Sequence, residues 1–185
     1  MNSNNSNTSN SGNRVQQFID AQKRFESTNL HEVVDTLLKS NTQLSITEIV
    51  EEIVKSYTGI HIGLSINKKM VAVKDFDLIE DYLFNLVAYS IVLNVRLNDN
   101  TTGFETIKTE GLNLFIKKNK DYGDAFAVFS VIGVIMRMGD KVSRLSTLVG
   151  GGVGGGDGVG NFESIADTAI DLYNYAHMVS LLINE

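Results

Sequence analysis

The absence of proline constrains the fold of this chain more than any other sequence feature. Proline lacks an amide hydrogen and its ring collides with the preceding helical turn, so a proline-free chain is able to form long, uninterrupted helices. Apolar residues between residues 14 and 183 recur mostly at intervals of three and four, which is the spacing of one helix face. The sequence therefore predicts an all-α fold, a helical bundle.

This spacing predicts seven helices, one of which begins at Ser45, because Glu48 three residues later completes a capping box. One segment, residues 60–73, differs. Residues 61–66 alternate polar and apolar side chains and residues 70–73 are apolar, so the segment predicts a short β-hairpin around residues 67–69. The expected helices cover residues 14–26, 31–38, 45–57, 75–97, 103–118, 124–148 with a break near Gly133, and 162–183.

Two segments of biased composition lie outside these helices. Residues 1–13 contain six asparagines and four serines with a single apolar residue, so we expect a disordered tail. Residues 150–160 hold eight of the sixteen glycines but no Gly-Lys-Ser/Thr, which favours a loop between two helices over a phosphate cradle. The expected organisation is this tail, a unit at residues 14–100 and a unit at 101–185 that contains the loop.

Composition excludes several classes of protein. The chain has no cysteine, so disulfides and thiolate metal sites are excluded. Its net charge of −6 argues against a protein that grips polymeric nucleic acid through phosphates, because that mode needs a basic face. The longest apolar run, residues 86–95, is about half a membrane span, and the N-terminus lacks the pattern of a signal peptide. We therefore expect a cytoplasmic protein that does not enter membranes.

Part of the sequence repeats when it is shifted by 86 residues, which aligns residues 78–92 with 164–178. Four positions are identical, and Asn85 takes the place of Asp171. Matched acids and tyrosines are harder to obtain from amphipathic periodicity than matched apolar residues, so the pattern predicts a tandem duplication; convergence of two amphipathic helices is the alternative. The identical pairs are Ile79 and Ile165, Asp81 and Asp167, Leu86 and Leu172, and Tyr89 and Tyr175.

Charged side chains gather on two helix faces of the second unit and allow two interpretations. One face carries Arg137, Asp140, Lys141 and Arg144, and the other carries Glu163, Asp167, Asp171 and Asn174. In the first interpretation the bases and acids form salt bridges between the helices. In the second, Asp140, Glu163 and Asp167 bind Mg²⁺, which activates a water, while the basic side chains neutralise phosphate oxygens. Both interpretations can hold in part.

Tyrosines of the same unit are candidates for stacking on a nucleobase. They are Tyr122, Tyr173 and Tyr175. The spacing of Tyr175 from Leu172 and Val179 predicts a core position for Tyr175. His177 lies on the apolar last helix without a second histidine at ligand spacing, so it indicates neither a metal site nor a catalytic triad.

Three ordered motifs resemble the nucleotide modification associated domain 1 family, which occurs in phages, large DNA viruses and bacteria and is a relative of the all-α nucleoside triphosphate pyrophosphatases of the MazG and dimeric dUTPase type. The motifs are KNKDYGDAF at residues 118–126, RMGDKVSRL at 137–145 and ESIADTAIDLYNYA at 163–176. The resemblance implies that the repeated unit is a pyrophosphatase-like helical unit. Its first copy lacks these motifs, so we expect that copy to be degenerate and structural.

The resemblance also implies roles for individual residues. Glu163 and Asp167 match the two outer acids of the Glu-Glu-x-x-Asp motif of the related pyrophosphatases, but Ser164 replaces its second glutamate. The Glu-Glu-x-x-Glu motif of their preceding metal-binding helix is absent, and only Asp140 stands there. The implied catalytic and metal-binding residues are Asp140, Glu163 and Asp167. The implied substrate-binding residues are Lys118, Asn119, Asp121, Tyr122, Arg137, Lys141, Arg144, Asp171 and Asn174.

The expected function is therefore binding of a nucleotide or deoxynucleotide, linked to the metabolism of modified nucleotides. Hydrolysis of its phosphate chain with Mg²⁺ as cofactor is implied less strongly, because of the missing glutamates. The resemblance further implies a homodimer and a viral setting in the host cytoplasm. The alternative is a non-catalytic helical module for binding or interaction.

Overall fold

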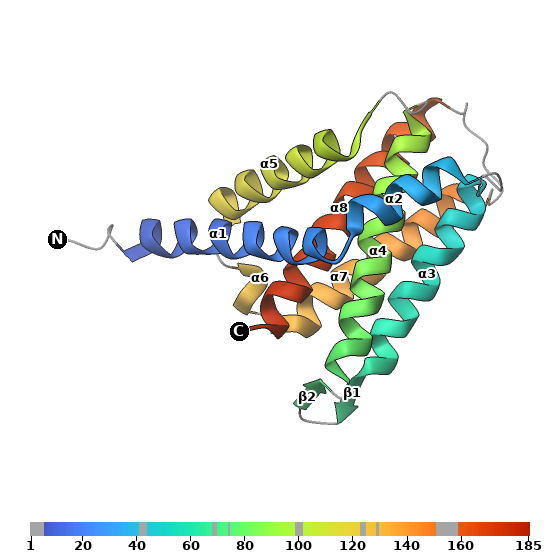
Figure 1. Ribbon diagram of the computed structural model, residues 1–185. Coiled ribbons are helices and arrows are strands. Elements are labelled where there is room, and N and C mark those ends of the chain that lie inside the picture. Colours follow the sequence, from blue (N-terminus) through green and yellow to red (C-terminus); the bar gives the residue numbers. More distant parts are fainter. Residues whose placement is uncertain are drawn as a thin grey trace.

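The computed structural model describes residues 6–40, 44–67, 70–73, 75–98, 102–122, 125–128, 130–150 and 159–185. In these residues the chain forms eight helices and one two-stranded antiparallel hairpin (Figure 1). This confirms the predicted all-α helical bundle. The elements are α1 Ser6–Ser27, α2 Leu30–Lys39, α3 Ile46–Gly63, β1 Leu64–Asn67, β2 Met70–Val73, α4 Phe76–Leu97, α5 Phe104–Tyr122, α6 Ala125–Val128, α7 Ser130–Val149 and α8 Val159–Ile183.

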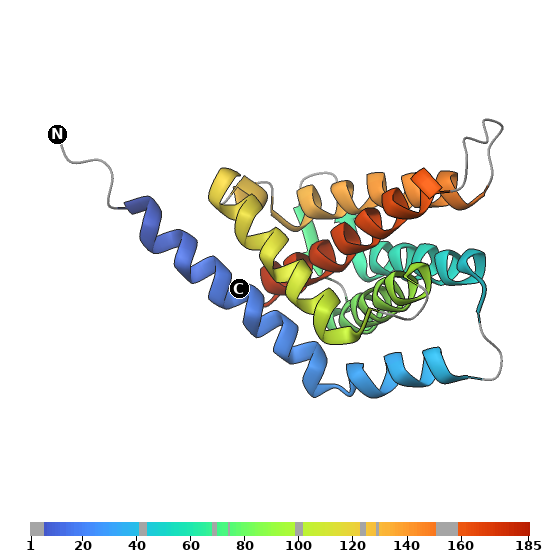
Figure 2. The same ribbon diagram turned by 90° about the horizontal axis from the view of Figure 1, so that it is seen from above.

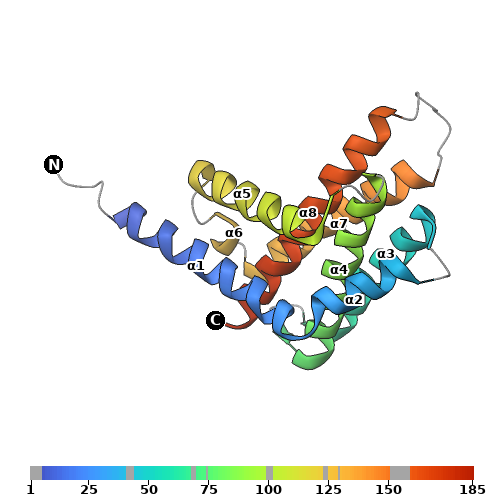
Figure 3. The same cartoon turned by 45° about the horizontal axis from the view of Figure 1, so that its top comes forward.

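Four long helices form the centre of the molecule. The antiparallel pairs α3–α4 and α7–α8 pack against each other, with α4 against α8 and α3 against α7 (Figures 1 and 3). Leu83, Leu86 and Ile91 of α4 and Leu172 and Ala176 of α8 are fully buried between them. This packing of apolar faces stabilises the bundle and leaves the polar faces of α7 and α8 for the site described below.

The remaining helices cover this centre from outside. α2 packs on α4, whereas α1 crosses α8 and α5 and extends beyond them at its N-terminal end (Figure 2). A second, smaller apolar cluster lies where α1, α5 and α8 meet. Its buried members are Phe18, Ala21, Phe115 and Leu181.

Among the described helices, α4 is long and apolar enough by length and composition to cross a membrane. Its most apolar window is 61% buried within the bundle. Packing against α3 and α8 accounts for this apolar character, as it does for the core helix of a bundle.

The predicted local signals at α3 are confirmed, with one change of boundary. The Glu48 amide donates to Ser45 Oγ at 3.3 Å, and the Ser45 amide donates to Glu48 Oε2 at 2.7 Å, which completes the capping box. The hairpin is also present, with Leu64 paired to Val73. However, α3 continues six residues beyond its expected end because Ile60 and Gly63 still face the core.

Two sequence-based boundaries are wrong. Residues 6–13 were expected in the disordered tail, but α1 begins at Ser6, since a formed helix extends by one hydrogen bond for each residue that it adds. The break expected near Gly133 lies earlier, between α6 and α7, where Ser130 has a positive φ of 56°. The rest of the tail, residues 1–5, and residues 151–158 of the Gly-rich loop lie outside the described residues.

Equivalent helices of the two halves end 86 residues apart. This is the separation of Gly63 in α3 from Val149 in α7, and of Leu97 in α4 from Ile183 in α8. The hairpin after α3 thus stands where the Gly-rich segment stands after α7. This spacing extends the sequence repeat from one helix to a pair, while the duplication itself stays a prediction.

Candidate functional site

A cleft of about 1000 Å³ opens between the C-terminal part of α5, the short α6 and the pair α7–α8. It brings together nine of the twelve site residues expected from the sequence. They are Lys118, Asn119, Tyr122, Arg137, Asp140, Lys141, Arg144, Asp171 and Asn174. These residues share a cleft because α5, α7 and α8 each turn one polar face toward it.

The polar end of the cleft is organised by one carboxylate. Asp171 of α8 accepts from Lys118 Nζ of α5 at 2.7 Å through Oδ1, and from Lys141 Nζ of α7 at 2.6 Å through Oδ2. One turn further along α7, Arg144 Nη2 donates to Ser164 Oγ at 2.6 Å. Two helices, α5 and α7, therefore direct cationic side chains toward α8.

The ionisation of Asp171 follows from these neighbours. Burial raises the pKa of its carboxyl, but the hydrogen bonds and charges of Lys118 and Lys141 outweigh burial and hold the pKa below its ordinary value. Asp171 is therefore ionised near neutral pH. Each ammonium has three donors and uses one on Asp171, so both lysines keep donors for a ligand.

The middle of the cleft carries two buried amides on facing helices, Asn119 of α5 and Asn174 of α8. Asn174 is 5% exposed, and its Oδ1 has no hydrogen-bond partner among the described residues. A buried acceptor left unpaired costs about 1–3 kcal/mol, which a ligand donor that reaches it recovers.

The opposite end of the cleft is apolar and aromatic. Phe115 and Phe126 meet edge to face with 5.8 Å between ring centroids, and Val134 and Met178 complete this wall. Tyr122, which is 73% exposed, stands at the rim. The cleft thus has a cationic end, an amide-lined middle and an aromatic end.

The tyrosines differ from the expectation. Tyr175, expected in the core, is half-buried and lines the cleft, whereas Tyr173 is 2% exposed and does not line it. Gln22 of α1 donates to the Tyr173 hydroxyl at 2.9 Å inside the protein, so this polar tip is satisfied without solvent. Burial also raises the pKa of Tyr173 above its ordinary value.

Three expected site residues are not gathered with the other nine. Asp121 and Asp167 are exposed and do not line the cleft, and the side chain of Glu163 lies outside the described residues. In the part of the chain that the structure describes, no three histidine, aspartate or glutamate side chains form a group able to hold a metal ion. Of the expected Mg²⁺ ligands, Asp140 alone is therefore placed in the cleft by a described side chain.

Sequence reasoning did not assign the aromatic wall to the site. Phe115, Val134 and Met178 carry the same apolar pattern as core residues, so periodicity does not distinguish them. Phe126 lies in the KNKDYGDAF motif, and its position four residues after Tyr122 is the sequence signal that could have assigned it to the site.

No protein-family model, curated protein or solved structure matches this chain.

Proposed function

We propose that this protein binds a nucleotide in the cleft, with the phosphates at the cationic end and the base at the aromatic end. The observation that carries the proposal is the separation of charge and aromatic surface within one cleft. The resemblance of its motifs to the nucleotide modification associated domain 1 family points to the same class of ligand.

The charge of the cleft supports an anionic group in the ligand. Four of its side chains are cationic and two are anionic, although the whole chain carries −6. Asp171 holds Lys118 and Lys141 within reach of one anion, and Arg144 lies one turn further along α7. Such fixed donors bind phosphate oxygens without first paying the entropy of ordering long side chains.

The rest of the cleft supports a flat, partly polar group. Phe126, Tyr122 and Tyr175 offer ring faces or edges of the kind on which bases stack. Asn119 and Asn174 offer amides between the rings and the cations, where they reach the edge of a base or the hydroxyls of a sugar.

Thermal unfolding tests this proposal directly. The four deoxynucleoside triphosphates, the matching nucleosides and inorganic tripolyphosphate are added to the full chain in turn. At a hundredfold excess over Kd, a deoxynucleoside triphosphate is expected to raise Tm by about 5–10 °C, because it binds only the folded state. The nucleosides are expected to raise Tm less, since they lack the phosphates.

A matched pair of variants separates the site from general charge effects. Lys141→Gln is expected to weaken binding of the triphosphates about tenfold or more, because a charge-assisted hydrogen bond is lost. The control is Lys55→Gln on α3, which removes the same charge from an exposed pair with Glu52. No rise in Tm with any probe at millimolar concentration, or equal weakening by both variants, contradicts nucleotide binding in this cleft.

Hydrolysis of the phosphate chain with Mg²⁺ is the catalytic extension of this proposal. Asp140, the expected ligand whose side chain lines the cleft, would hold the Mg²⁺, and the ion would supply Lewis-acid activation of the phosphate and of a water. Release of pyrophosphate or phosphate is measured for the wild type, Asp140→Asn and Asp167→Asn with Mg²⁺. Equal rates in all three leave a binding protein without this activity.

A further inference from the structure

The aromatic end of the cleft is backed by α1, a helix whose described side chains do not line the cleft. Phe18 of α1 is fully buried and stacks on Phe115 of α5, with ring centroids 4.1 Å apart and planes inclined by 11°. Phe115 in turn meets Phe126 of α6. A continuous row of three rings therefore runs from α1 to the wall of the cleft.

A second contact joins α1 to the same wall. The Arg14 guanidinium lies 5.8 Å from the centre of the Phe126 ring, within the range of a cation–π interaction. Arg14 is itself oriented by Gln17 Oε1 at 3.0 Å and by an ion pair with Glu185. Gln17 also donates to Glu185 at 3.3 Å, so the two partners of the guanidinium are bonded to each other.

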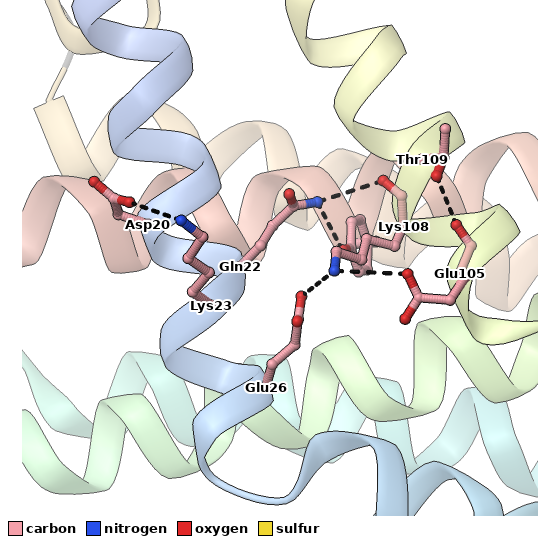
Figure 4. A network of polar contacts seen from close by, with 8 residues as sticks. Asp20, Gln22, Lys23, Glu26, Glu105, Lys108 and Thr109 are labelled. Carbon is pink, nitrogen blue, oxygen red and sulfur yellow. Dashed lines mark hydrogen bonds and ion pairs between the residues drawn. The ribbon is translucent and has the colours of Figure 1, made fainter.

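The next part of α1 is fastened to α5, as Figure 4 shows. Gln22 Nε2 reaches the Lys108 carbonyl oxygen at 3.4 Å, and Lys108 Nζ pairs with Glu26 at 2.8 Å and with Glu105 at 3.7 Å. α1 is therefore fixed relative to the helix that carries Lys118 and Asn119.

The wall needs such support because of the length of α6. This helix has four residues, which is too short to be stable without tertiary contacts. Phe126, like Val15 and Met178, packs against the small apolar cluster that contains Phe18. The position of its ring therefore depends on α1.

We propose that Arg14 and Phe18 are positioning residues, which hold the Phe115–Phe126 wall in the orientation that receives the flat group of the ligand. The role of the wall in binding rests on the proposed function, whereas the support of the wall by α1 does not. Arg14 and Phe18 thereby affect recognition of the base and not of the phosphates, because the cationic end is assembled by Lys118, Lys141 and Asp171.

Binding to the full chain tests this role with two probes. Arg14→Gln removes the cation from the ring, and Lys23→Gln is the matched control, since it removes the same charge from an exposed position of α1. Arg14→Gln is expected to raise the Kd of the best-bound deoxynucleoside triphosphate about two- to fivefold and to leave the Kd of inorganic tripolyphosphate unchanged. Arg14→Lys keeps a cation near the ring and is expected to restore part of the affinity.

An equal rise in the Kd of both probes overturns the proposal, because α1 then acts on the whole cleft. An unchanged Kd for the triphosphate also overturns it. If the wild type binds no nucleotide, the proposed function fails, but the support of the wall by α1 is still tested by a measurement without ligand. The aromatic NMR signals of Phe126 are expected to shift in Arg14→Gln and in Phe18→Leu but not in Lys23→Gln. Unchanged Phe126 signals in the first two variants also overturn the proposal.

Discussion

Asp171 shows how a single side chain combines the two interpretations of the charged faces. It forms ion pairs with Lys118 and Lys141, as interhelical salt bridges require, and the same contacts orient the ammonium groups in the cleft where we propose that phosphate binds. Because both of its oxygens are already engaged with ammonium groups, Asp171 serves here as an anchor for cations. The sequence showed the acid and the bases, and packing decided which of them met.

His177 is a second residue whose chemistry is decided by its surroundings. It is fully buried against the rings of Phe18, Phe25 and Tyr173, and its Nδ1 lies 2.7 Å from the Tyr173 carbonyl oxygen. Nε2 has no hydrogen-bond partner among the described residues. Burial lowers the pKa of this imidazole to about 4, so it stays neutral in the folded protein at neutral pH.

This depressed pKa predicts a loss of stability in acid. Between the ordinary histidine pKa near 6.5 and the folded value, the unfolded chain binds the proton more tightly, so the free energy of unfolding falls as pH falls. Relative to His177→Leu, the wild type is expected to lose about 3 kcal/mol between pH 7.5 and pH 4. Urea unfolding at both pH values measures this difference.

The control for this experiment is His31→Gln, whose side chain is exposed. It is expected to follow the wild type across the same pH range. A constant difference between the wild type and His177→Leu at the two pH values contradicts a neutral, buried imidazole.

At the scale of helices, α5 and α8, which both line the cleft, approach each other closely. α5 has a glycine at the contact, Gly111, and a Cβ added there lies 2.7 Å from a ring carbon of Tyr173 and 3.0 Å from Asn174 Oδ1. Tyr173 has little room to yield, because it is buried and bonded to Gln22. A larger residue at 111 therefore pushes α5 away from α8.

Overpacking in Gly111→Ala is expected to lower the free energy of unfolding by about 1–3 kcal/mol. The higher helix propensity of alanine is expected to offset up to about 1 kcal/mol of this loss. The variant is also expected to weaken ligand binding, because Lys118 and Asn119 move with α5. The matched control is Gly103→Ala at the start of the same helix, where an added Cβ meets nothing within 4 Å. Chemical unfolding of both variants checks this, and equal stability of the two contradicts the close contact.

At the scale of the whole molecule, the helix pairs α3–α4 and α7–α8 carry different charged side chains, although the ends of their helices are equally spaced. On α3 and α4 the positions 86 residues before Arg137, Asp140 and Arg144 hold Glu51, Val54 and Thr58, and Asn85 precedes Asp171. The position 86 residues before Lys141 holds Lys55, so of the three cations that α7 places in the cleft, Lys141 has a cationic counterpart on α3 and Arg137 and Arg144 do not. That the first unit is structural stays a prediction.

Assembly of two copies remains a prediction from the resemblance. We propose that the homodimer forms through exposed apolar side chains of α6 and α7, namely Val128, which is 77% exposed, and Met136, which is 67% exposed and also lines the cleft. Sedimentation of the wild type is expected to give twice the chain mass of 20.3 kDa, and Met136→Lys is expected to shift it toward the monomer. A wild type that sediments as a monomer at high concentration contradicts this assembly.

The sequence by itself determined the helices and most polar residues of the cleft. Helix formation and the sharing of a face by residues three, four and seven apart are local properties, so the faces of α7 and α8 were predictable before any packing was known. The capping box at Ser45 and the hairpin after α3 were predictable for the same reason.

Only the tertiary structure decided which of these residues meet. Three contacts join residues from different helices: Gln22 with the Tyr173 hydroxyl, Asp171 with two lysines, and Phe18 with Phe115. Packing also decided that Tyr173 is buried and that Tyr175 lines the cleft. An apolar residue has the same periodicity whether it faces the core or a cleft, because periodicity reports a face and not its neighbour. The neighbour is selected by how whole helices pack, and that depends on the shape of every side chain between them.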